Sequence, residues 1–154
     1  SGISRYQKDF TLSNGLLASG QRIILDLGEL SDSAQVFING VDAGVTWIAP
    51  FTLDVTNYLQ AGKNSIRIDL ASSWINRLIS DEAYPDYSQL WRKDGKPVRV
   101  MPSWYTDNKP LPRSGEKGKR ITFTTYKFVN KNDPLVDSGL LGPVSLLAIK
   151  EIKL

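Results

Sequence analysis

The feature that most constrains the fold of this chain is the pair Asn39-Gly40, set between two runs in which apolar and polar residues alternate. Both central residues of a type I′ β-turn need a positive φ angle, which Asn and Gly adopt at little cost. We therefore predict a β-hairpin of residues 35–38 and 41–47. The surrounding stretch, residues 35–70, is predicted to form an antiparallel unit that organises the other strands.

Further strands are predicted on both sides of this unit, at residues 5–12, 22–27, 51–55, 65–71, 121–128 and 144–154. The run RIILDL at residues 22–27 is typical of a strand buried on both faces. A turn is predicted at Asn14-Gly15 and a single helical turn at residues 56–61. Seven or eight short strands with almost no helical periodicity indicate an all-β antiparallel sandwich, a jelly roll.

The length of 154 residues predicts one domain, 1–154. Residues 80–120, approximately, form a long irregular insertion that holds five of the eight prolines and two of the four tryptophans. Insertions of this length are usually functional or mobile. No stretch approaches the roughly 18 consecutive apolar residues that a membrane span needs, so no membrane span is expected.

Histidine and cysteine are both absent. Their absence removes the commonest general base, the Ser-His-Asp triad and the usual zinc ligands. The four glutamates show no paired-acid arrangement of the kind that glycosidases use. We therefore expect this chain to be non-catalytic on its own and to hold no cofactor. A structural calcium ion near Asp32 stays open, although a turn-capping role for that residue is the better interpretation.

Positive charge is concentrated in residues 84–120, which carry nine Lys and Arg against four Asp and Glu. An anionic partner would explain this asymmetry, and so would a solvated lysine-rich loop. We favour the loop and expect no nucleic-acid partner, because no nucleic-acid-binding motif accompanies the charge.

Aromatic residues are concentrated near the predicted loops, where their flat faces suit sugar rings or a protein interface. For Trp47 and Trp74, which lie next to strand ends, we favour packing in the core. Trp91, Trp104 and Tyr105 lie inside the insertion and are candidate carbohydrate or interface residues.

Four segments carry a resemblance to a known family: LDLGEL at residues 25–30, the hairpin stretch at 34–56, WINRLISD at 74–81 and the closing residues 122–144. They resemble the galactose-binding-like β-sandwich domain of the glycoside hydrolase family 2 sugar-binding type. The likeness is to the form found in the C-terminal part of large bacterial α-L-rhamnosidase-like glycoside hydrolases. This resemblance covers essentially the whole chain.

The resemblance implies a non-catalytic ancillary module that supports the catalytic domain of the same polypeptide, in a periplasmic, cell-surface or secreted bacterial enzyme. Asn76, Arg77 and Asp81 match the family's NRL-x-x-D pattern and would brace the insertion or a domain interface, with a simple loop salt bridge as the alternative. Contact with a plant or host glycan is the second implied role, with Arg77 and the insertion aromatics as contacts. A purely structural docking module without a ligand is the alternative.

Overall fold

The computed structural model describes residues 2–17, 20–84, 106–109, 121–122 and 128–150. The chain divides into two compact units: Ser1–Ser73 with Asp137–Leu154, and Trp74–Val136. The predicted insertion falls within the second unit, and most of it lies outside the described residues. The single domain 1–154 stays a prediction.

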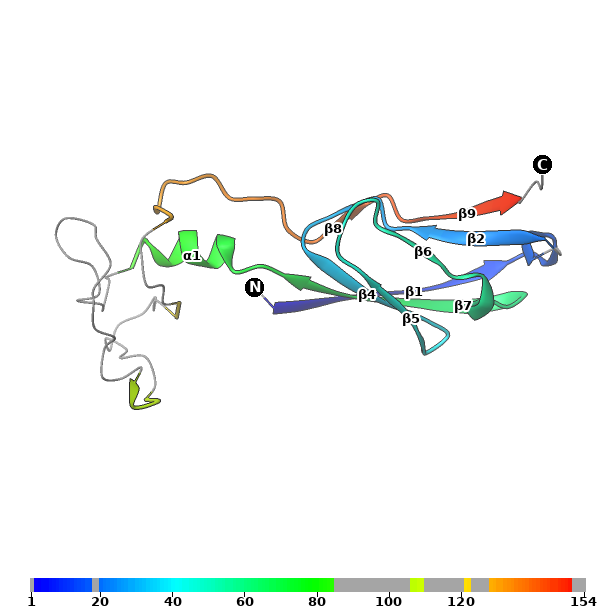
Figure 1. Ribbon diagram of the computed structural model, residues 1–154, viewed down its shortest axis with the longest axis horizontal. Coiled ribbons are helices and arrows are strands. Elements are labelled where there is room, and N and C mark those ends of the chain that lie inside the picture. Colours follow the sequence, from blue (N-terminus) through cyan, green and yellow to red (C-terminus); the bar gives the residue numbers. More distant parts are fainter. Residues whose placement is uncertain (1, 18–19, 85–105, 110–120, 123–127, 151–154) are drawn as a thin grey trace. The chain divides into compact units, whose positions relative to one another are not determined.

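The first unit is an antiparallel β-sandwich (Figure 1). One layer has the strand order β1-β7-β4-β5, the second has β6-β2-β9, and β3 pairs separately with β8. This confirms the predicted all-β antiparallel sandwich. The strands are β1 (Gly2–Leu12), β2 (Gln21–Asp26), β3 (Glu29–Leu30), β4 (Ser33–Ile38), β5 (Val41–Thr46), β6 (Thr52–Asp54), β7 (Gly62–Ser72), β8 (Leu140–Gly142) and β9 (Ser145–Lys150).

The predicted hairpin is confirmed, with β4 and β5 joined at Asn39 and Gly40. These two residues have φ angles of 52° and 82°, as a type I′ turn requires. The Asn39 side chain also ties the turn to the next strands. Its Nδ2 donates to Tyr58 O at 3.0 Å and to Asn64 Oδ1 at 2.9 Å, and its Oδ1 accepts from Ser65 N at 2.9 Å. The turn is therefore fixed by both backbone conformation and side-chain contacts.

The core lies between the two layers and is built by period-two alternation. In β7, Ile68 and Leu70 are buried while the residue between them, Asp69, faces outward, as predicted. In β2, Ile23 and Leu25 are buried, but their neighbours are not. The prediction that this strand is buried on both faces is wrong, because only one layer covers it. The core cluster contains Ile23, Leu25, Leu27, Leu30, Ala34, Val36, Ile38, Val55, Ile68 and Leu70.

Several local predictions differ from the structure. The turn at Asn14-Gly15 is a short 3-10 helix, η1 (Asn14–Leu17), and the turn after β6 is another, η2 (Thr56–Tyr58). Residues 28–33, where no strand was predicted, contain β3, whose partner β8 is distant in sequence. The strand predicted at 121–128 lies mostly outside the described residues, and residues 121, 122 and 128 are not in a strand.

The second unit contains the helix α1 (Ile75–Asp81), which was not predicted. It has seven residues, of which Ile79 and Asp81 are buried. The preceding residue, Trp74, starts the helix without a side-chain cap. Within the described ranges, no helix has the length and apolar character needed to cross a membrane.

Candidate functional site

Helix α1 brings together the three residues of the NRL-x-x-D pattern, Asn76, Arg77 and Asp81. Arg77 and Asp81 are four residues apart and therefore lie on the same face of the helix. Arg77 Nη2 lies 2.8 Å from Asp81 Oδ1. The side chain of Asp81 is fully buried, whereas that of Arg77 is 33% exposed. The pair thus joins a buried carboxylate to a partly exposed guanidinium group.

The second oxygen of Asp81 binds a distant part of the chain. Asp81 Oδ2 accepts hydrogen bonds from Ile121 N, Thr122 N and Thr122 Oγ1, each at 2.8 Å. Burying a carboxylate is costly unless its charge is paired and its oxygens accept hydrogen bonds. Here Arg77 pairs the charge and the three donors satisfy Oδ2, while Oδ1 contacts Arg77 as an ion pair and accepts no hydrogen bond. Asp81 therefore joins the end of α1 to residues 121–122.

Asn76 makes a matching contact at the start of the helix. Its Nδ2 donates to Val136 O at 2.8 Å, and its Oδ1 accepts from Val136 N at 2.9 Å. This two-bond pairing fixes the direction of the backbone at Val136. One short helix thus holds two chain segments that follow it by 40 to 60 residues.

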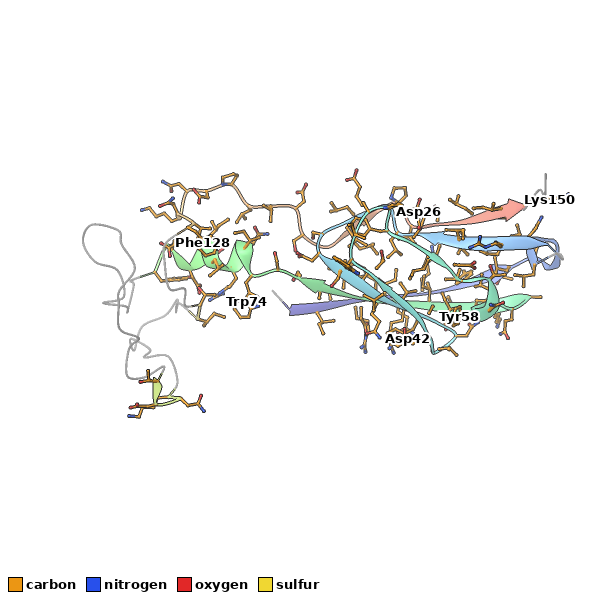
Figure 2. The ribbon with its side chains drawn as sticks, in the orientation of Figure 1. Asp26, Asp42, Tyr58, Trp74, Phe128 and Lys150 are labelled. Atoms are coloured by element: carbon orange, nitrogen blue, oxygen red, sulfur yellow. The ribbon has the colours of Figure 1, made fainter. Side chains whose placement is uncertain are left out.

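The structure describes Asn76, Arg77 and Asp81 but not the other predicted site residues. Trp91, Trp104 and Tyr105 lie outside the described residues, so their proposed contacts stay predictions. Trp47 and Trp74 were predicted to pack in the core, and that is wrong: they are 71% and 53% exposed. Figure 2 shows Trp74 just before α1. Thr46 fills the buried position at the end of β5, so the next residue turns outward.

A polar row that sequence reasoning missed crosses the outer face of the four-stranded sheet. Arg5 on β1 donates from Nε to Asp69 Oδ1 at 2.7 Å and from Nη2 to Asp69 Oδ2 at 2.9 Å. These hydrogen bonds lower the pKa of Asp69 from its ordinary value and raise the pKa of Arg5. Arg67 Nε lies 3.5 Å from Asp69 Oδ2, so two cations flank this carboxylate.

The row continues onto β4 and β5. The Arg67 guanidinium carbon lies 3.7 Å from the centre of the Phe37 ring, within the range of a cation–π contact. Gln35 Nε2 donates to Asp42 Oδ2 at 2.9 Å across the hairpin (Asp42 is labelled in Figure 2). The only sequence signal for this row is the outward position of each residue in its strand. Bringing the residues together requires the strand order.

Metal ligands do not gather in the described residues, where no group of three or more Asp or Glu side chains is placed to hold an ion. A structural calcium ion near Asp32 was left open by the sequence. Asp32 has a φ angle of 75° and accepts a hydrogen bond from Ser73 N at 2.6 Å. Its carboxylate therefore binds the residue that follows β7, 41 positions later in the chain.

Comparison with known proteins identifies the family to which this architecture belongs. Residues 4–107, more than half of the chain, match the family described as "Glycosyl hydrolase 2 galactose-binding domain-like". A Formosa agariphila protein provisionally named beta-glucuronidase is 38% identical over 152 residues, which are 98% of this chain and 12% of that protein. A beta-galactosidase of Yersinia pestis (strain Angola) is 38% identical over 93 residues, or 58% of this chain and 8% of the relative.

A solved structure agrees over nearly the whole chain. The rhamnosidase from Novosphingobium sp. PP1Y matches with a TM-score of 0.67 and 32% sequence identity, over 97% of this chain and 11% of that chain. The chain therefore spans only about an eighth of the length of the larger proteins that it matches in full. The sequence match and the antiparallel sandwich together show that this chain belongs to the galactose-binding domain-like family of glycosyl hydrolase 2.

Proposed function

We propose that this chain is a non-catalytic, ancillary module of a bacterial glycoside hydrolase and that it supports the catalytic domain of the same polypeptide. The observation that carries the proposal is the set of contacts made by α1. Asp81 binds Ile121 and Thr122, so the two ends of the segment 82–120 are joined by hydrogen bonds. Asn76 fixes the chain again at Val136.

The segment between the joined ends has the composition of a contact region. It carries Trp91, Trp104, Tyr105 and nine Lys and Arg against five Asp and Glu. Trp, Tyr and Arg are the residue types that dominate protein interfaces. A brace at the base of such a segment reduces the conformational entropy lost when it binds a partner. We assign the partner role to the catalytic domain.

The parent enzyme's activity is part of the same proposal. The match to the rhamnosidase structure covers nearly the whole chain, which supports an α-L-rhamnosidase-like parent. The relative named for glucuronide hydrolysis matches the chain to the same extent, so the rhamnosidase-like activity of the parent is our proposal and the glucuronidase activity is its alternative. We further propose a periplasmic, cell-surface or secreted location. Placement in the C-terminal part of the parent stays a prediction.

Contact with a plant or host glycan is the finer part of the proposal. Asn76 and Asp81 are committed to backbone partners, whereas one third of the Arg77 side chain is exposed. Arg77 and the insertion aromatics are therefore the proposed glycan contacts in the second unit. The alternative is a docking module that binds no ligand and uses the same segment only against the catalytic domain.

Limited proteolysis tests the supporting role. We expect cleavage between residues 84 and 120 in the 154-residue chain and protection of the same sites in the intact enzyme. Equal cleavage rates in both would contradict docking. Titration of the chain with plant and host glycans, followed by NMR, separates the two alternatives, because no chemical-shift change at millimolar glycan contradicts the glycan contact. Glycoside hydrolysis by the chain alone would overturn the non-catalytic assignment.

A further inference from the structure

The outer face of the four-stranded sheet has a shallow hollow of about 220 Å³. Each of the four strands contributes to its wall. The lining residues are Ile3 of β1, Ser33 and Gln35 of β4, Val45 of β5, and Asp69 and Ala71 of β7. The hollow therefore combines three aliphatic side chains with a hydroxyl, an amide and a carboxylate. All of these residues belong to the first unit.

The polar groups of this hollow are held in place by neighbours. Asp69, 14% exposed, is fixed by the two hydrogen bonds from Arg5 and by Arg67 at 3.5 Å. A carboxylate offers about four lone-pair sites, so Asp69 keeps acceptor capacity beyond these contacts. Gln35 is oriented by its bond to Asp42. A ligand that bonds to these groups loses little side-chain entropy, which favours binding.

An exposed aromatic side chain follows the strand that closes one side of the hollow. The pairs Gln35–Val45 and Ala34–Thr46 set the register of β4 with β5. Trp47 follows directly after Thr46, the last paired residue of β5, and Ser33, which lines the hollow, directly precedes its partner Ala34. Val45 and Trp47 are 55% and 71% exposed, while Thr46 between them is buried, so both lie on the outer face.

We propose that this face binds a neutral saccharide, with one pyranose ring in the hollow and a neighbouring ring stacked on Trp47. Sugar rings present apolar C–H faces and hydroxyl edges, which match an aromatic face beside fixed acceptors. The volume is smaller than the roughly 300 Å³ at which pockets for drug-sized ligands begin, so it suits a single ring.

Charge decides which saccharide fits. The row around the hollow contains two cations, Arg5 and Arg67, and two anions, Asp42 and Asp69. These charges balance, so the row offers no net attraction for the carboxylate of a uronic acid, whose charge would also lose water on binding. A neutral oligosaccharide meets no such cost. The choice of a saccharide as ligand rests on the proposed function, but the site is separate from Arg77 and the insertion aromatics.

NMR titration of the uniformly ¹⁵N-labelled 154-residue chain tests the inference. The probes are neutral trisaccharides built from galactose, glucose, mannose, xylose or rhamnose, and a galacturonic acid trisaccharide for comparison. We expect at least one neutral trisaccharide to give saturable shifts with a millimolar Kd. The shifts should be centred on the Trp47 indole N–H and the amides of Gln35, Val45 and Ala71.

Two tryptophan variants provide the matched comparison. Trp47→Ala should weaken binding about tenfold or more, since stacking on the indole is lost. Trp74→Ala removes an exposed tryptophan in the other unit and should leave the Kd unchanged. Gln35→Ala keeps Trp47 and should also weaken binding, which tests the contribution of the hollow independently of stacking on the indole.

Absence of saturable shifts with every neutral trisaccharide, or an unchanged Kd in Trp47→Ala, would overturn the site. Tighter binding of the galacturonic acid trisaccharide would overturn the ligand class. Absence of shifts around Trp47, with protease protection of residues 84–120 retained in the intact enzyme, contradicts the inference but not the supporting role. Trisaccharide binding at Trp47 together with equal cleavage of residues 84–120 in the chain and in the intact enzyme contradicts only the supporting role.

Discussion

Replacing Asp81 with alanine should destabilise the second unit by about 3–4 kcal/mol. The side chain is fully buried, and its removal leaves Arg77 without its anion and three hydrogen-bond donors on residues 121–122 without their acceptor. Breaking a buried pair in this way costs about 3–5 kcal/mol, and we expect the lower half of that range because Arg77 is partly exposed and regains water. Urea denaturation gives the free energy of unfolding. Hydrogen exchange at the Ile121 and Thr122 amides locates the loss.

The matched control is Asp107→Ala. Lys109 Nζ lies 2.8 Å from Asp107 Oδ2, the same separation as in the Arg77–Asp81 pair, but Asp107 is 46% exposed. Its loss should cost less than about 1 kcal/mol, because exposed pairs contribute little. Asp81→Asn keeps one acceptor oxygen and should fall between the two. Equal losses for Asp81→Ala and Asp107→Ala would refute the argument from burial.

Three other outcomes are expected. Gly62→Ala should cost about 1–2 kcal/mol in urea denaturation, because alanine is strained at its φ of 86°. Gly28→Ala should cost clearly more, because a Cβ there would overlap the backbone carbonyl group of Gly142, and equal costs would contradict this. Asn39→Ala should cost about 2–4 kcal/mol by thermal unfolding, because it strains the positive φ and removes the three side-chain hydrogen bonds. Asn39→Gly should cost less, because glycine adopts the positive φ and only the three hydrogen bonds are lost. Hydrogen bonds from Thr56 lower the pKa of Asp54 below its ordinary value of 3.8. The ionised Asp54 therefore stabilises the fold fully above pH 3.8, and this stabilisation is lost as the pH falls through the pKa of the folded state. Asp54→Asn should therefore flatten the acid limb of the stability curve, and an unchanged limb would contradict the assignment.

The parts of the fold that were predictable depend on local chemistry. The Asn39-Gly40 turn needs only two residues with positive φ, and the inward positions of Ile68 and Leu70 follow from alternation within one strand. Both are encoded in fewer than ten neighbouring residues. The sandwich follows because several such strands must cover one another's apolar faces.

The parts that failed depend on contacts between distant segments. Helix α1 has fewer than two full turns that could show an apolar period, and its side chains bind residues 40 to 60 positions away. Trp47 was assigned to the core from residue type, but the smaller Thr46 occupies the buried position. The polar row depends on Arg5 meeting Asp69, 64 residues later, which only the order of strands decides.

The place of β2 in its sheet also determines when the sandwich can be completed. β2 is the central strand of its layer, and it pairs with β6 on one side and β9 on the other. Gln21 pairs with Lys150, so the second neighbour leaves the ribosome about 130 residues after β2 does, a delay on the order of ten seconds at typical translation rates. All of the second unit is synthesised in that interval. Closure of the three-stranded layer is therefore a late, high-contact-order step, during which the open edge of β2 is exposed to mispairing with other strands.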